Sequence, residues 1–153
     1  MIRTRHRETG FTLVELLIVV IILGILAAVV IPQFNTAAAE SKESALASNL
    51  ATIRQAIEMY KVQHNDAYPG STITDQLTNT TDVAGATTGT KYGPYIRNSF
   101  PKNPIANDAV VSVVTTGPAA ASGTQGWVYN SVTGEFRANS TGAGPSGTNY
   151  FDL

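Results

Sequence analysis

The chain contains no cysteine, so no disulfide stabilises any part of it. Its charged residues amount to 14%, whereas roughly a quarter is usual in globular domains. The two histidines, His6 and His64, lie far apart in the sequence. Because there is also no glycine-rich phosphate loop and no cluster of metal-ligand residues, we find no catalytic residue and no cofactor-binding residue. We therefore expect that the protein is not an enzyme.

The charges that are present nearly balance. Lysine and arginine number 10, aspartate and glutamate number 11, and the formal net charge is −1. Nucleic-acid-binding domains usually have a clear basic excess, so we do not expect nucleic acid as a partner.

One long apolar run, residues 11–31, dominates the sequence and contains a single charged residue, Glu15. As an α-helix it would be about 31 Å long, at roughly 1.5 Å per residue, which is close to the thickness of a bilayer's hydrocarbon core. The run is apolar on every side, so no face is prepared for a soluble core. Arg3, Arg5 and Arg7 precede it, and positive charge on this side of a span keeps that end in the cytoplasm.

Two residues distinguish this run from an ordinary membrane anchor. Glu15 lies near its start, where a carboxylate is costly and persists only with a partner. Gly10 separates the polar leader from the apolar run, whereas a secretory signal is cut after its apolar region. A cut after Gly10 would leave the apolar helix in the mature protein.

These residues resemble the class III leader of type IV pilins and type II secretion pseudopilins. The resemblance consists of the basic leader, the stretch Gly10-Phe11-Thr12-Leu13-Val14-Glu15, and the apolar run that ends at Pro32. It implies cleavage between Gly10 and Phe11 by a prepilin peptidase on the cytoplasmic side, followed by N-methylation of Phe11. It also implies that Glu15 pairs with the amino terminus of a neighbouring subunit during assembly. The alternative is a plain signal anchor in which Glu15 has no role.

The resemblance also implies a location and a set of partners. We expect a single-pass protein of the bacterial inner membrane, with a cytoplasmic N-terminus and a periplasmic head. Its partners would be further copies of itself in a homo-oligomeric filament, the prepilin peptidase, and an assembly platform with its ATPase. After assembly the filament would be periplasmic or extracellular.

Beyond Pro32 the helix is expected to continue, with a kink at the proline. Residues 33–61 contain no glycine or proline and are rich in good helix formers. Apolar residues recur there at spacings of three and four, which indicates an amphipathic helix. This stripe consists of Leu46, Leu50, Ile53, Ile57 and Tyr60. The helix should end near residues 64–65, before Tyr68-Pro69-Gly70.

The remaining chain predicts a small α+β head. We expect strands at residues 109–116, 126–130 and 135–138, because these stretches are rich in β-branched or aromatic residues, with a hairpin turn at 131–134. A short helical turn is expected around residues 74–77. The predicted fold is one long N-terminal helix, membrane-spanning in its first half, packed on a three-stranded antiparallel sheet.

Four segments follow from this prediction. They are a leader at residues 1–10, a transmembrane and assembly helix at 11–32, an amphipathic helix extension at 33–64, and the head at 65–153.

The block Pro101-Lys102-Asn103-Pro104 is similar to a block of the major pseudopilin of type II secretion, which usually has aspartate in place of Asn103. Together with the absence of cysteine, it favours a major pseudopilin. The close alternative is a type IV pilin for adhesion, twitching motility or DNA uptake. A membrane-anchored binding protein that does not polymerise, or an exported enzyme, is less favoured because neither gives Glu15 a use.

Calcium is the one ion that the resemblance raises, because the major pseudopilin family binds it in its carboxyl-terminal loop. Here the tail offers only Asp152 beside several carbonyl groups. We therefore expect no cofactor, and calcium binding stays open as the alternative.

We predict that the mature protein begins at methylated Phe11. The intact mass of protein from the native host should show the loss of residues 1–10 and the gain of one methyl group. Gly10→Val should block cleavage, because a branched side chain would crowd the cut site. A mature form that retains Arg3 to Gly10 in the presence of the peptidase would contradict the class III leader.

Overall fold

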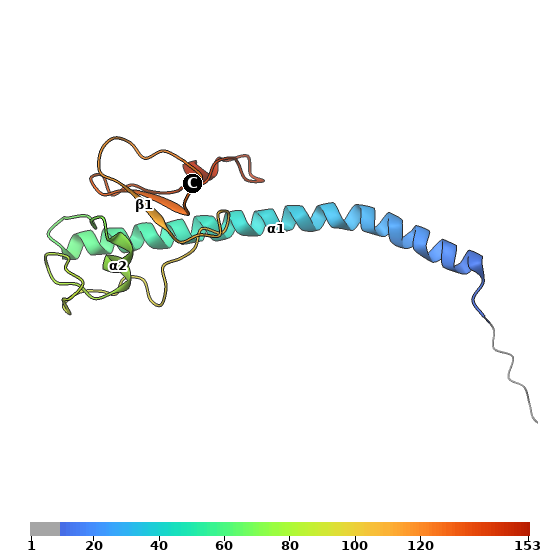
Figure 1. The fold of residues 1–153 in the computed structure, drawn as a ribbon, viewed down its shortest axis with the longest axis horizontal. Helices are drawn as coiled ribbons and strands as arrows, with labels where there is room; N and C mark the ends of the chain where they lie inside the picture. The colour runs from blue at the N-terminus through green and yellow to red at the C-terminus, as the bar shows by residue number, and fades with distance from the viewer. Residues whose placement is uncertain (1–9) are drawn as a thin grey trace, which may run out of the picture. The chain divides into compact units, whose positions relative to one another are not determined.

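The computed structural model describes residues 10–153, and it forms two compact units, one up to Ala37 and the other from Ala38 to Leu153 (Figure 1). The elements in chain order are α1 (Leu13–Gln63), α2 (Ile73–Thr78), β1 (Val111–Val114), β2 (Trp127–Asn130), β3 (Phe136–Ala138) and the 3₁₀-helix η1 (Tyr150–Asp152). The α+β prediction is confirmed.

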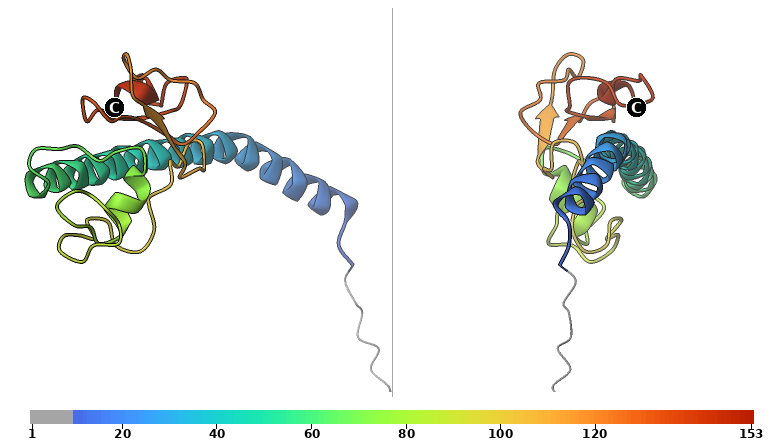
Figure 2. Two further views of the ribbon diagram at one scale, coloured as in Figure 1. Left: turned by 60° about the vertical axis from the view of Figure 1, so that its left-hand side comes forward. Right: turned by 90° about the vertical axis from the view of Figure 1, so that its right-hand side faces the viewer.

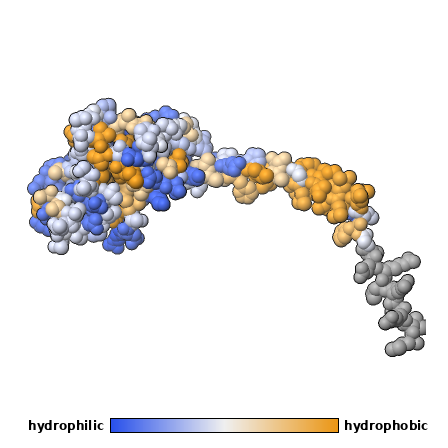
Figure 3. All heavy atoms as spheres, viewed as in Figure 1, coloured by the Kyte–Doolittle hydropathy of each residue, from blue (hydrophilic) through white to orange (hydrophobic). Residues whose placement is uncertain are grey.

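The first unit consists mainly of the start of α1, which continues through Pro32 without interruption. Its large apolar side chains are exposed, and Figure 3 shows them along this part of the helix. By length and composition α1 can cross a membrane. These side chains therefore lack cover from the described chain itself. The predicted kink at Pro32 stays a prediction.

In the second unit, the predicted stripe of α1 is buried, together with Ala56, and forms the α1 side of the core. The helix ends at Gln63, within two residues of the predicted end. Asn65 and Asp66 follow with φ of 53° and 62°, a left-handed conformation that Asn and Asp tolerate better than most residues. Figure 2 shows the sheet and α2 against different sides of this part of α1.

The sheet has the order β1-β2-β3, but it is mixed, so the prediction of a purely antiparallel sheet is wrong. β2 and β3 pair antiparallel, as the hairpin predicts, while β1 pairs parallel with β2, Val111 opposite Trp127 and Val114 opposite Asn130. Parallel neighbours need a crossover of about a dozen residues or more, and residues 115–126 supply it. The Asn130 Nδ2 group donates to the Gly117 carbonyl at 2.8 Å and holds this crossover beside the sheet.

The aromatic side chains of the sheet lie in the core. Trp127, Tyr129 and Phe136 are buried, and the Trp127 and Phe136 ring centroids are 5.4 Å apart. The polar tips have partners: Tyr129 Oη donates to the Pro69 carbonyl at 2.9 Å, and Trp127 Nε1 donates to the Pro101 carbonyl at 2.9 Å. Burial raises the pKa of the Tyr129 phenol, which therefore stays a neutral donor.

Asn103, the residue that departs from the pseudopilin pattern, is fully buried and joins three segments. Its Nδ2 group donates to the Gly126 carbonyl at 2.6 Å and to Ser140 Oγ at 3.0 Å. Its Oδ1 atom accepts from the amides of Ile105 and Ala106, at 2.8 and 3.2 Å. A carboxylate could accept the last two bonds but could not donate the first two. The amide is therefore required by this packing.

We predict that Asn103→Asp lowers the free energy of unfolding of the head by roughly 1–3 kcal/mol, because it leaves a buried carbonyl without its donor. Chemical denaturation followed by tryptophan fluorescence measures this change through buried Trp127. The matched control is Asn98→Asp, the same substitution at an exposed residue. An unchanged midpoint for Asn103→Asp, or an equal loss in the control, would contradict the role given to the amide.

Candidate functional site

Glu15 lies in the first turn of α1, where its side chain bonds back to the residue before the helix. The Thr12 amide and the Thr12 hydroxyl both donate to Glu15 Oε2, at 2.8 and 2.9 Å. In return the Glu15 amide donates to Thr12 Oγ1 at 3.2 Å. This reciprocal arrangement is a capping box, which satisfies amides that the first helical turn leaves without partners.

The capping box gives Glu15 a role within its own chain that our sequence analysis missed. The signal was present, because Thr12-Leu13-Val14-Glu15 has the spacing of such a box. A negative charge at this end of a helix is also favoured by the helix dipole. The box therefore explains how one chain holds a carboxylate at the start of an apolar helix.

The capping box uses only one of the two carboxylate oxygens of Glu15. Both donated bonds end on Oε2, and among residues 10–153 no hydrogen bond reaches Oε1. An ionised carboxylate has about four acceptor positions, so Oε1 can accept from a cationic group without any loss of the Thr12 bonds.

The predicted processing residues lie directly before this site. Phe11 is 84% exposed, and neither Gly10 nor Phe11 belongs to α1. A side chain at residue 10 would meet no atom within 4 Å among the described residues. The packing of residues 10–153 therefore does not require glycine at this position. Arg3, Arg5 and Arg7 of the leader lie outside the described residues.

The structure locates the other predicted residues, but it does not test the roles predicted for them. Pro32 lies inside α1 and is exposed, and its carbonyl accepts from Thr36 Oγ1 at 3.2 Å. Asp152 accepts a hydrogen bond from Asn149 Nδ2 at 3.0 Å and lies 3.9 Å from Arg137. Among residues 10–153, no three His, Cys, Asp or Glu side chains gather as metal ligands would. The roles of Pro32 and of calcium stay predictions.

Comparison with known proteins identifies a motif in the same stretch of sequence as the Thr12–Glu15 capping box. The family described as "Prokaryotic N-terminal methylation motif" matches residues 5–31. The chain is similar to type II secretion system core protein G of Pseudomonas aeruginosa, with 42% identity over 67 residues, or 44% of this chain and 46% of that protein. This match spans less than half of that relative. No solved structure matches the chain.

Two further relatives match over longer stretches. Type II secretion system core protein G of Vibrio cholerae is 31% identical over 103 residues, which are 67% of this chain and 69% of that protein. Type IV major fimbrial protein FimA of Dichelobacter nodosus is 37% identical over 116 residues, 71% of this chain and 70% of that protein. Matches of this extent show that the chain belongs to the family of type IV pilins and type II secretion pseudopilins.

Proposed function

We propose that the protein is a structural subunit of a helical filament anchored in the bacterial inner membrane, the major pseudopilin of a type II secretion system. The observation that supports this best is the half-satisfied carboxylate of Glu15 at the start of an exposed apolar helix. Such a group is costly in a membrane unless it has a partner, so it is a functional candidate by default.

Processing would create the missing partner. A cut between Gly10 and Phe11 leaves an ammonium group on Phe11, only a few residues from the carboxylate of Glu15. Every mature subunit then has one cation and one anion at the same end. If the cation of one subunit pairs with the anion of the next, two different patches meet, and repetition of such a contact generates rings or open helical filaments.

The free energy of such assembly would not come mainly from burying the apolar helix. Lipid tails are already apolar, so transfer of the helix from lipid to a protein core gains little. Side-chain packing and the charge pair would therefore set the register between subunits. Extraction from the membrane needs external work, and we assign it to an assembly platform and its ATPase, as in the family.

Topology follows from the leader. Arg3, Arg5 and Arg7 would keep the N-terminus in the cytoplasm, where the prepilin peptidase cuts, and the head would reach the periplasm. The role proposed for the protein is structural rather than catalytic. It is supported by relatives named as a secretion core protein and a fimbrial protein.

The second candidate is a type IV pilin, and the FimA relative supports it. The repeated match to proteins named core protein G and the absence of cysteine favour the pseudopilin.

Deletion of the gene in the native host should separate the two candidates. For a pseudopilin, exoproteins should accumulate in the periplasm and disappear from the culture medium, measured by mass spectrometry of both fractions. The control is the same strain with the gene restored. Unchanged secretion with loss of surface filaments or twitching motility would favour the pilin.

The Glu15 role is tested by two substitutions that separate its bonds from its charge. Glutamine also forms capping boxes, so Glu15→Gln should keep the Thr12 bonds but lose the ion pair, whereas Glu15→Ala loses both. If the ion pair drives assembly, both variants should insert and be cleaved yet form few filaments. A lone buried charge costs several kcal/mol, so the unpaired ammonium of the neighbour adds to the loss.

Filaments are measured by immunoblotting of sheared fractions and by electron microscopy, with cleavage checked by intact mass. Thr12→Ser, which keeps the hydroxyl, is the control and should assemble normally. Abundant filaments from a fully processed Glu15→Gln variant would show that assembly does not need the charge of Glu15.

A further inference from the structure

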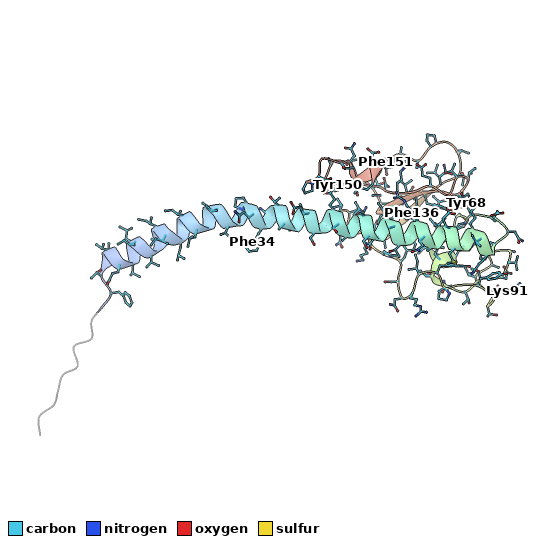
Figure 4. The ribbon with its side chains drawn as sticks, turned by 180° about the vertical axis from the view of Figure 1, so that it is seen from behind. Phe34, Tyr68, Lys91, Phe136, Tyr150 and Phe151 are labelled. Atoms are coloured by element: carbon cyan, nitrogen blue, oxygen red, sulfur yellow. The ribbon has the colours of Figure 1, made fainter. Side chains whose placement is uncertain are left out.

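The C-terminal segment of the second unit is attached to the rest of the head at two places. Its last residues are held by arginines: Arg54 Nη1 donates to the Leu153 main-chain oxygen at 2.8 Å, and Arg137 Nη1 donates to the Phe151 carbonyl at 3.0 Å. Arg137 also lies over the Phe151 ring, 5.0 Å from its centroid. Figure 4 shows Tyr150 and Phe151 on the side of α1 where Phe136 lies.

The loop before these residues, 142–149, is a turn with its own internal bonds. The Gly144 amide donates to the Thr148 carbonyl at 3.0 Å, and the Gly147 amide donates to the Gly144 carbonyl at 2.9 Å. The Tyr150 amide closes the loop on the Gly142 carbonyl at 3.0 Å. These bonds shape the loop, but they do not attach it to α1.

Attachment of this loop to α1 depends on one side chain, Glu43. The Ser146 amide donates to Glu43 Oε2 at 3.2 Å, and the Ser146 hydroxyl donates to Glu43 Oε1. Within residues 10–153, every hydrogen bond between this loop and α1 ends on Glu43. Both oxygens of the carboxylate are used, and bonds to an ionised acceptor are stronger than those between neutral groups.

The main chain of the loop also lies directly against the carboxylate. A side-chain carbon added at Gly144 would come too close to the Glu43 carboxylate, so the carboxylate would have to move away from the loop. The loop and Glu43 together line one groove with Glu40, Ser44, Ala47 and Leu153. Glu43 is thus half-buried, whereas Glu40, one turn away on the same helix, is exposed.

We propose that Glu43 and Ser146 form a latch that holds the loop 142–149 closed on α1. The latch gives this cysteine-free chain a non-covalent and reversible attachment for its C-terminal loop. When it opens, the loop should swing out while the arginine-held residues 150–153 and the sheet stay in place.

Hydrogen exchange of the full chain in detergent micelles, followed by mass spectrometry, tests this latch. Glu43→Ala should raise the exchange rate of a peptide covering 142–149 about tenfold, equivalent to about 1.4 kcal/mol of local opening. Ser146→Ala, which removes only the hydroxyl bond, and Glu43→Gln, which keeps one acceptor, should each give a smaller increase. Alanine is a good helix former, so the substitution at residue 43 should not disturb α1.

Glu40→Ala is the matched control, because it removes the same charge from the same helix without touching the loop's bonds. It should leave the exchange of residues 142–149 unchanged, and in every variant β2 should stay protected. Unchanged exchange in Glu43→Ala, an equal increase in Glu40→Ala, or equal loss of protection in β2 would overturn the latch.

Discussion

The structure depends on one constraint: the first part of α1 is apolar on all sides and finds no cover within its own unit. Such a helix needs lipid or other protein around it. The first turn adds a further demand, because a helix leaves its first four amides without intrahelical partners and Glu15 adds a carboxylate. The Thr12–Glu15 box satisfies two of these amides, those of Thr12 and Glu15, and uses one carboxylate oxygen, so the other oxygen is left for a partner.

From residue 46 onward α1 follows a different rule. Its stripe is buried by the sheet side and by α2, and its other face is exposed. The two parts of one helix therefore differ in the cover that the described chain gives them. Substitutions that a soluble helix would tolerate, such as a new charge, would be costly before residue 32 and mild on the exposed face after residue 40.

Much of this could be read from the sequence because the signals are local. The helix end at Gln63, the buried stripe, α2 and the β2–β3 hairpin each follow from residues close together in the chain. The strand direction of β1 could not be predicted, because the crossover 115–126 is made of small residues with no local preference for a path. Asn103 was flagged only as a departure from a pattern. An asparagine is needed there because its side chain donates to Gly126 and Ser140, which lie 23 and 37 positions away in the chain.

The parallel pairing of β1 with β2 also affects how the head folds. The hairpin of β2 and β3 is local and can form quickly, but β1 must wait for closure of its crossover, and the stripe of α1 must wait for Trp127 and Phe136. Contacts between segments so distant in the chain form late. Under the proposed topology, the stripe on α1 would have no partner from the sheet until residues 127–138 had crossed the membrane. During such export, the apolar first part of the helix and the apolar stripe of its second part would both be uncovered, so chaperone protection or rapid membrane insertion would be most valuable at that stage.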